Sequence, residues 1–316
     1  MSTAPRIMQR QVRVNAAGRD YTGLRVGFTI EKDLTRAPNH AEVILYNLAR
    51  KTREGLHRGD GKVPVVVEAG YRDTGMILLF SGEMREAFSR PEPDGSWATV
   101  LRAGDGDTAL RKARNATGAR PGVSAERVIS EAFGELKVGA GNLFTELKKQ
   151  VGSADFSVDK LGAAFEKGFA GTGSVAEQFD KTLKSAGLEF SVQDGQLQVL
   201  GAGKALGTVA TILAPETGLE GSVEVDAKGT CHCRVRIVPG LGPGYPVQIT
   251  RSSAEAIGDL LRFGFDVDRT VYRIEKTRYV GDTHGQDWNA EIDCRDMSLP
   301  PIPKKTKQAQ APEASQ

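Results

Sequence analysis

Three cysteines and two histidines in the C-terminal third are the residues best suited to metal chemistry. Cys231, His232 and Cys233 are consecutive, and His284 and Cys294 follow at a distance. Residues at i and i+2 of a strand share a face, so both thiolates of the first group could bind one ion. Structural zinc sites usually present two close pairs of ligands, and the second close pair is missing. We therefore interpret the cysteines as small buried hydrophobic residues, with a zinc site as the alternative.

Two glycine-rich stretches suggest ion or phosphate binding only superficially. The segment Gly201–Lys204 resembles a phosphate loop, but Gln198 replaces the first glycine of that motif and Ala205 replaces its magnesium-binding Ser or Thr. The segment Gly104–Asp107 offers two carboxylates to calcium, but the glutamate expected further on is absent. We predict a loop after a hairpin for the first stretch and the start of a helix for the second.

Acidic residues occur where a pair could act as general acid and base on a glycan. The candidates are Glu83, Glu86 and Glu92, and also Asp282 and Asp287. Acidic residues that alternate outward on strands usually form a solvated face. The sequence also lacks the Gly-x-Ser-x-Gly motif of serine hydrolases. We therefore predict no catalytic residues and no cofactor.

One local cluster of basic residues could contact nucleic acid. It consists of Arg111, Lys112 and Arg114, with Arg120 beyond. Aromatic residues are not interleaved with it, so a solvated helix face is the favoured interpretation. The formal net charge of the chain is only +2, which predicts no general attraction to nucleic acid.

Composition limits the compartment and the number of cores. The 316 residues, 39% of them hydrophobic, can form two or three modest cores, and the 37 glycines are typical of short strands with many turns. Residues 1–15 contain no apolar run typical of a signal peptide, and no stretch reaches the length of a membrane span. Three cysteines are too few for a disulfide framework. We expect synthesis in a reducing cytoplasm and no membrane insertion.

The stretch 174–200 has the strongest local signals. Ser174 and Glu177 have the spacing of a capping box, and Gly187 is suited to end the helix that follows. Alternating apolar residues come next, and Asp194-Gly195 favours a type I′ turn between two strands. The sequence therefore predicts a helix that leads directly into a hairpin, at the junction of two β regions.

The remaining pattern predicts a mainly β chain with α insertions. About six short strands before residue 105 indicate a small barrel or sandwich, with strands at 76–80 and 83–88 among them. Helices are expected at 108–114, 124–133, 143–151 and 161–169, with too few apolar residues for a separate core. We predict domains at 1–105 (β), 106–187 (helical) and 188–299 (β), and a disordered polar tail at 300–316.

Three groups of residues, in this order, resemble the baseplate hub proteins of contractile-tailed phages and of phage-like injection systems. These proteins form the late-control-D and VgrG-like hub superfamily. The groups are NHAEVILYNL (39–48) with EAGY (68–71) and FSG (80–82); residues 168–174 with GLEFSVQDGQLQVL (187–200); and PETGL (215–219) with PG (243–244) and GDTHGQDW (281–288). The resemblance covers most of residues 20 to 295. The Cys231–Cys233 stretch fits the pattern least.

The resemblance implies a structural role in a phage tail and no enzymatic activity. Such hubs contain two related small β-barrel domains joined by a helical segment, and three copies form a ring around a conduit. A homotrimer with two barrels per chain would match a six-fold tail tube to a three-fold spike. The implied partners are the tail tube or distal tube protein, the central spike, other baseplate proteins and a tape-measure protein. DNA would be a transient passenger, and the location would be the tail baseplate of the virion.

Two alternative functions stay open from the sequence. One is a peptidoglycan hydrolase at the tail tip, which would need an acid and a base in a cleft. The other is a tail-tube or distal-tail ring protein, which is also built from β barrels but is expected to be hexameric.

Overall fold

The computed structural model describes residues 9–57, 63–106, 110, 114–119, 133–151, 169–185, 187–207, 209–226, 229–250 and 271–298. The N-terminal elements are β1 (Arg10–Ala16), β2 (Arg19–Tyr21), β3 (Val26–Asp33), β4 (His40–Tyr46), α1 (Arg50–His57), β5 (Pro64–Tyr71), β6 (Gly75–Pro91) and β7 (Trp97–Gly104). The prediction of strands before residue 105 is therefore confirmed within the described residues.

The remaining elements include the helices of the chain's middle part and the C-terminal strands. They are β8 (Arg114–Ala119), α4 (Leu143–Val151), β9 (Phe169–Ser174), α6 (Val175–Ser185), β10 (Leu188–Gln193), β11 (Gln196–Gly201), β12 (Thr211–Leu213), the 3-10 helix η1 (Pro215–Thr217), β13 (Leu219–Val225), β14 (Thr230–Arg236), β15 (Pro246–Ile249), β16 (Val271–Asp282) and β17 (Trp288–Asp296). The prediction of a mainly β chain with helical insertions is confirmed. No described helix combines the length and the apolar character that a membrane crossing requires.

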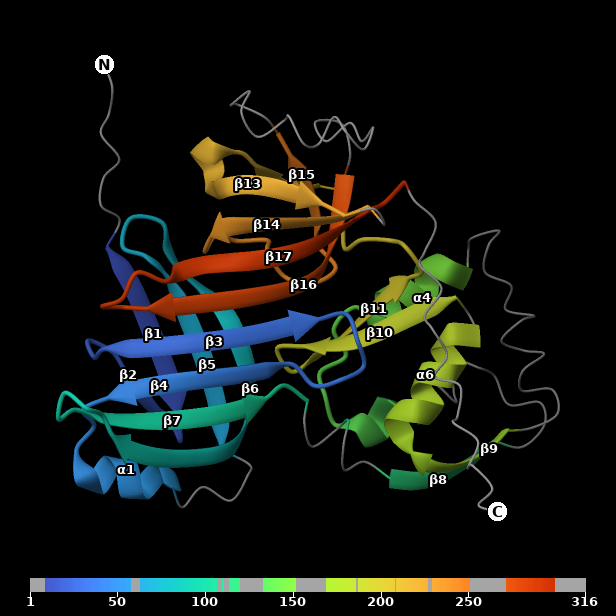
Figure 1. Ribbon diagram of the computed structural model, residues 1–316. Coiled ribbons are helices and arrows are strands. Elements are labelled where there is room, and N and C mark those ends of the chain that lie inside the picture. The colour runs from blue at the N-terminus through green and yellow to red at the C-terminus, as the bar shows by residue number, and fades with distance from the viewer. Residues whose placement is uncertain are drawn as a thin grey trace, which may run out of the picture.

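Most strands belong to one thirteen-stranded sheet. Its main order is β13-β14-β17-β16-β3-β4-β7-β6-β5-β1-β2, and β15 and β12 extend it from β16. In Figure 1 the strands from β13 to β7 lie one below another, and β1 and β5 cross behind them. The enclosed apolar side chains come from both ends of the chain. For example, the rings of Phe28 on β3 and Trp288 on β17 pack edge to face, 5.5 Å apart.

The expected division into two β-barrel domains is not confirmed. β3 of the N-terminal region pairs with β16 of the C-terminal region over seven residue pairs, from Lys276 opposite Asp33 to Asp282 opposite Gly27. Strands of both regions therefore share the thirteen-stranded sheet, and the described strands form no closed barrel. The physical reason is that edge backbone groups of each half are satisfied by the other half instead of by closure within it.

The strands predicted at 76–80 and 83–88 are instead one bent strand. The first part of β6 pairs with β5 and the second part with β7. Gly82 lies at the bend, where an added Cβ would come within 2.6 Å of the carbonyl oxygen of Gly104 and of the Phe80 ring. Only glycine allows this approach. The strand β6 can therefore leave β5 and continue along β7 without a break.

A second core forms beside the sheet, which the sequence did not predict. It is built from one face of α6, from α4 and from the β10–β11 hairpin, with Phe179, Leu183 and Phe190 at its centre. The two helices supply six of its thirteen buried residues and the hairpin supplies five, so the helices alone would not form this core. The predicted helix and hairpin of residues 174–200 are confirmed, with positive φ at Gly187 (72°), Asp194 (55°) and Gly195 (77°).

Several predictions fall on residues outside the described ranges. They are most of the helices expected at 108–114, 124–133 and 161–169, and the polar tail at 300–316. The helix expected at 143–151 is confirmed as α4. The ladder between β8 and β9 was not predicted from the sequence.

The second core can be tested by deleting its central ring. Phe179 is fully buried and packs 5.0 Å from Phe190, so Phe179→Ala should lower the free energy of unfolding by about 3–5 kcal/mol. Phe144→Ala is the matched control, because Phe144 is 41% exposed, and should cost about 1 kcal/mol or less. Urea unfolding followed by far-ultraviolet circular dichroism measures both. Equal effects of the two variants would contradict a separate core around Phe179.

Candidate functional site

The turn of the β10–β11 hairpin is anchored to the main sheet by a buried carboxylate. Asp105, at the end of β7, is fully buried. Its two oxygens accept hydrogen bonds from the backbone N–H groups of Asp194 (2.5 Å) and Gly195 (2.8 Å). A carboxylate that accepts two N–H donors of one tight turn fixes both the position and the direction of that turn. Asp105 therefore joins the second core to the sheet.

A buried amide completes the same contact. The Asn39 side chain donates to the carbonyl oxygen of Val192 (2.8 Å) and to Oε1 of Gln193 (3.1 Å), and it accepts from the backbone N–H of Asp33 (3.0 Å). Asn39 is only 3% exposed, so the loss of any of these hydrogen bonds would leave a buried polar group unsatisfied and would lower the stability of the fold. Asn39 thus links the β3–β4 connection to the hairpin. We name Asn39, Asp105, Lys32, Gln193 and Asp194 the joint.

The third contact of the joint is an ion pair. Lys32 of β3 is 5% exposed and its Nζ lies 2.6 Å from Oδ2 of Asp194. Nζ also donates to the carbonyl oxygen of Leu79, and Oδ1 of Asp194 accepts from the backbone N–H of Ser81. Because Lys32 is buried and Asp194 is its charged partner, removing the Asp194 carboxylate would leave a buried, uncompensated ammonium group.

The charges of the joint shift the titration of its central carboxylate. Burial raises the pKa of Asp105 to about 6, and the neighbouring negative charge of Asp194 adds to the rise. The N–H groups of the turn and the positive charge of Lys32 act in the opposite direction. Asp105 therefore changes its charge near neutral pH instead of in the usual acidic range.

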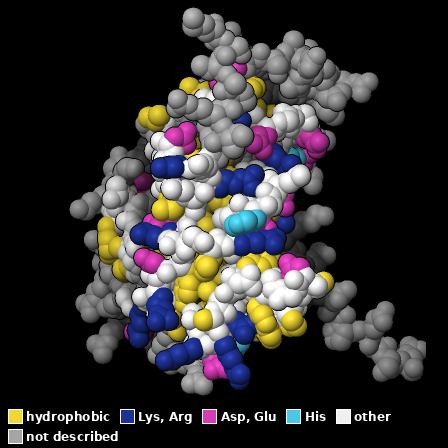
Figure 2. Space-filling view, turned by 90° about the vertical axis from the view of Figure 1, so that its left-hand side faces the viewer, with side chains coloured by type: hydrophobic (Ala, Val, Ile, Leu, Met, Phe, Trp, Pro, Cys, Tyr) yellow, Lys and Arg dark blue, Asp and Glu magenta, His cyan; other side chains and the backbone are white. Residues whose placement is uncertain are grey.

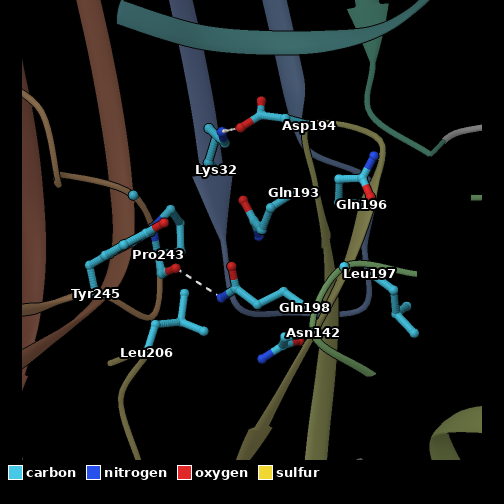
Figure 3. Close-up of a pocket in the computed structure, with 12 residues that line it drawn as sticks. Lys32, Asn142, Gln193, Asp194, Gln196, Leu197, Gln198, Leu206, Pro243 and Tyr245 are labelled. Atoms are coloured by element: carbon cyan, nitrogen blue, oxygen red, sulfur yellow. Dashed lines mark hydrogen bonds and ion pairs between the residues drawn. The ribbon is translucent and has the colours of Figure 1, made fainter. Parts of the chain in front are cut away.

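A cleft of about 330 Å³ lies beside the joint (Figure 3). Its wall contains Lys32, Asp194 and several amide side chains, and Leu206, Pro243 and Tyr245 close the opposite side. The amides are largely engaged within the protein: Gln198 donates to the carbonyl of Pro243 (2.9 Å), and Asn142 bonds both backbone groups of Val199. Gln198 thus holds the hairpin against the loop before β15, and Asn142 holds it against the start of α4. The arrangement is suited to holding the second core against the main sheet.

The sequence predicted only part of the joint. Asp105 was considered for calcium, but its oxygens accept N–H donors of the turn, and Asp107 lies outside the described residues. Asp194 was identified as a turn residue, and its ion pair with Lys32 was missed. The available signal was the type of residue: an Asp or Asn directly next to the end of a strand.

The three cysteines lie together in the sheet, and His232 points away from them. Cys231 lies opposite Cys294 in the β14–β17 ladder, and Cys231, Cys233 and Cys294 are all buried. His232, on the other face, pairs with Asp293 at 2.8 Å. The described residues contain no cluster of ligands suited to a metal ion. Burial raises the pKa of the Cys294 thiol well above its usual value, which favours an inert thiol.

Three of the five acid and base candidates, Glu86, Glu92 and Asp282, are bonded to arginines. Glu86 pairs with Arg102 (3.2 Å) and Glu92 with Arg90 (3.0 Å). Burial opposes the ionisation of Asp282, but the hydrogen bond and charge of Arg25, together with the backbone N–H groups of His284 and Gly285, outweigh it and lower the pKa of Asp282. A general acid needs a raised pKa, so these pairs favour a structural interpretation.

The two remaining candidates are the glycine-rich segment 201–204 and the basic cluster 111–120. Residues 202–204 form a turn after β11, and the carbonyl oxygen of Lys204 accepts a hydrogen bond from Arg273 (2.8 Å). The predicted loop is confirmed. In the basic cluster, Arg111, Lys112 and Arg120 lie outside the described residues, and Arg114 begins β8.

The titration of Asp105 predicts an unusual dependence of stability on pH. Because its folded pKa is raised from 3.8 to about 6, the native state binds a proton more tightly than the unfolded chain. The free energy of unfolding should therefore be largest below pH 4 and fall by up to about 3 kcal/mol as pH rises to 6, relative to Asp105→Asn. The comparison removes the contribution of all other carboxylates. Urea titrations between pH 4 and 8 measure it, and a difference that is constant or grows with pH would contradict the assignment.

Packing and zinc binding predict different behaviour for the cysteines. If the thiols only fill the core, Cys294→Ala should cost about 1–2 kcal/mol, whereas His232→Ala should change stability by about 0.5–1 kcal/mol or less. Addition of EDTA should leave the melting temperature of the wild type unchanged. A fall in melting temperature with chelator, matched by a similar loss in both variants, would establish the metal site instead.

Comparison with known proteins identifies the fold. No protein-family model matches the sequence, and no curated protein matches it. The 43 kDa tail protein of prophage MuSo2 from Shewanella oneidensis is similar with a TM-score of 0.59 and 9% identity, over 92% of this chain and 98% of that chain. A tail protein from Neisseria meningitidis MC58 has a TM-score of 0.56 and 12% identity, over 91% and 96% of the two chains.

A third solved structure extends the likeness to injection machines. The E. coli c3393 protein, a component of the type VI secretion system, has a TM-score of 0.52 and 8% identity, over 90% of this chain and 76% of that chain. It is itself described as similar to the T4 bacteriophage tail proteins gp27 and gp5. The chain therefore has the fold of phage tail proteins and of a type VI secretion component.

Proposed function

We propose that this protein is a structural hub subunit of a phage tail or a related contractile injection system. The observation that carries the proposal is that the fold matches two phage tail proteins over nearly the full length of both partners. In this role the chain forms a homotrimeric ring that joins the tail tube to the central spike. Other baseplate proteins and a tape-measure protein are further expected partners, and the location is the virion tail.

The continuous sheet supports a role as the wall of a ring around a conduit. Strands from the two predicted β domains form one broad surface, so each chain can present two β regions to its neighbours. Three chains would then offer six related β regions to a six-fold tube. The three-fold symmetry of the ring itself would match a three-fold spike. The division at residues 105, 187 and 299 stays a prediction within this proposal.

The charges on the solvent side of the sheet suit a passage for DNA. Arg278 lies between Glu291 (2.9 Å) and Glu31 (3.5 Å), and Arg102 bonds Glu42 (3.0 Å). Each exposed pair contributes only about 0–1 kcal/mol to stability. Their main effect is that cations on this surface are matched by neighbouring anions, so passing phosphates would not be retained. We assign this surface to the conduit.

The oligomer number separates this proposal from its alternatives. Mass photometry of the purified chain should show a species three times the 33.9 kDa chain mass, and the trimer should co-elute with the spike protein of the same tail. A hexamer would favour a tail-tube or distal-tail ring. A monomer that binds neither neighbour, or clearing of peptidoglycan in a zymogram, would contradict a structural hub.

A further inference from the structure

A basic face with an exposed tryptophan lies at one end of the molecule. We define the basic face as Arg50, Lys51 and Arg53 of α1 together with Trp97 at the start of β7. Residues 49–57 contain three cations and one carboxylate, Glu54, giving a net charge of +2. Figure 2 shows Lys and Arg side chains gathered toward its lower edge, the level at which Figure 1 places α1.

The geometry of the basic face is typical of a protein interface. The Arg53 guanidinium stacks on the Trp97 ring at 3.9 Å, and Trp97 is 41% exposed. Within the described residues, Nη1 of Arg53 is buried without a hydrogen-bond partner. Tryptophan and arginine are enriched among the residues that dominate binding energy, and a stacked guanidinium keeps its remaining donors free for a carboxylate.

An acidic face lies at the other end of the sheet. We define it as Glu220 and Glu224 of β13, with Glu216 and Asp226 beside that strand. Residues 214–226 contain these four carboxylates and no Lys or Arg, giving a net charge of −4. Glu224 is exposed, and Glu220 has a distant ion pair with Arg236 at 3.6 Å. Among the described strands, β13 pairs only with β14 and is an edge of the sheet.

The two faces are placed so that one copy can meet the next. β13 is the top strand of the sheet in Figure 1, whereas α1 lies below β7 at the bottom. Contact between two different faces of identical subunits is heterologous, and such contacts produce a closed ring when the rotation between copies is suitable. Opposite charges bring the correct faces together and disfavour contacts between like faces.

We propose that the basic face of one copy docks on the acidic face of the next, and that three such contacts close the ring. This inference rests on the proposed trimeric hub and names its contact surfaces. Trp97 is the central anchor, and Arg53 and Lys51 meet the carboxylates of β13. The register shift in β13 between Glu220 and Glu224 disfavours simple strand addition there, so the contact is made through side chains.

Charge reversal on each face tests the proposal directly. One variant carries Lys51→Glu and Arg53→Glu, and a second carries Glu220→Lys and Glu224→Lys. A control with Lys181→Glu and Lys184→Glu on exposed positions of α6 makes the same charge change as the first variant away from both faces. Circular dichroism confirms that each variant is folded, and mass photometry with analytical ultracentrifugation gives its oligomeric state at low and high salt.

We expect each face variant to raise the dissociation constant of the ring roughly 100-fold or more, while the control stays trimeric. A mixture of the two variants combines one intact face from each. It should therefore associate, both through the two intact faces and through the two reversed faces, which also carry opposite charges. A three-membered ring of two kinds of copy always contains one contact between like-charged faces, so the mixture should not close a stable trimer. A chain with all four substitutions regains opposite charges and should form the trimer again.

The outcomes separate this inference from the proposed function. If the wild type and both face variants are equally trimeric, the contact surfaces are wrong and the trimer stands. If both variants dissociate but neither the mixture nor the fourfold variant assembles, the contact is not head to tail and the inference fails. A wild type that stays monomeric at all concentrations overturns the trimeric hub itself.

Discussion

The pairing of β3 with β16 is the interaction on which the architecture depends. These strands are separated by more than 200 residues in the sequence, and their ladder joins the N-terminal and C-terminal strands into one sheet. Without it, β3 and β16 would each expose a row of backbone donors and acceptors on an apolar strand. The side chains behind the ladder, including Ile30 and Ile274, are fully buried in a core that both halves share. The two halves therefore stabilise each other.

The second core depends on a smaller set of polar contacts. Asp105 and Asn39 hold the hairpin by hydrogen bonds to its backbone, which specify one orientation in a way that apolar packing alone does not. Such buried polar groups cost free energy unless every partner is present. The joint thus sets the position of α4, α6 and the hairpin relative to the sheet. A subunit whose parts keep a fixed position suits an assembly in which the same contact must recur in every copy.

Local signals in the sequence were sufficient for elements whose stability is also local. Gly187, Asp194 and Gly195 identified the end of α6 and the hairpin turn, because few residues tolerate positive φ. The alternating residues Trp288, Ala290 and Ile292 of β17 are buried, which agrees with the period of a strand. Asn289 lies between two of them and is buried as well, which the alternation does not predict. The continuity of β6 was missed, because Gly82 looks like a turn residue and functions as a point of close approach.

The long-range features could not be read from one sequence. Neither partner in the β3–β16 ladder specifies the other, because an apolar strand of this length can pair with many others. The same holds for Lys32 and Asp194, whose ion pair spans 162 positions. The resemblance to tail hubs indicated the fold that the comparisons found, although the expected pair of separate barrels was not among the described strands.

Hydrogen–deuterium exchange tests the central claim, that the two halves share one cooperative sheet, most directly. The account predicts that amides in β3, β4, β16 and β17 exchange together in the slowest class, through a single opening event with the free energy of global unfolding. Faster exchange of β13 to β17 as a group, while β3 and β4 stay protected, would show two independent β units and would contradict the account.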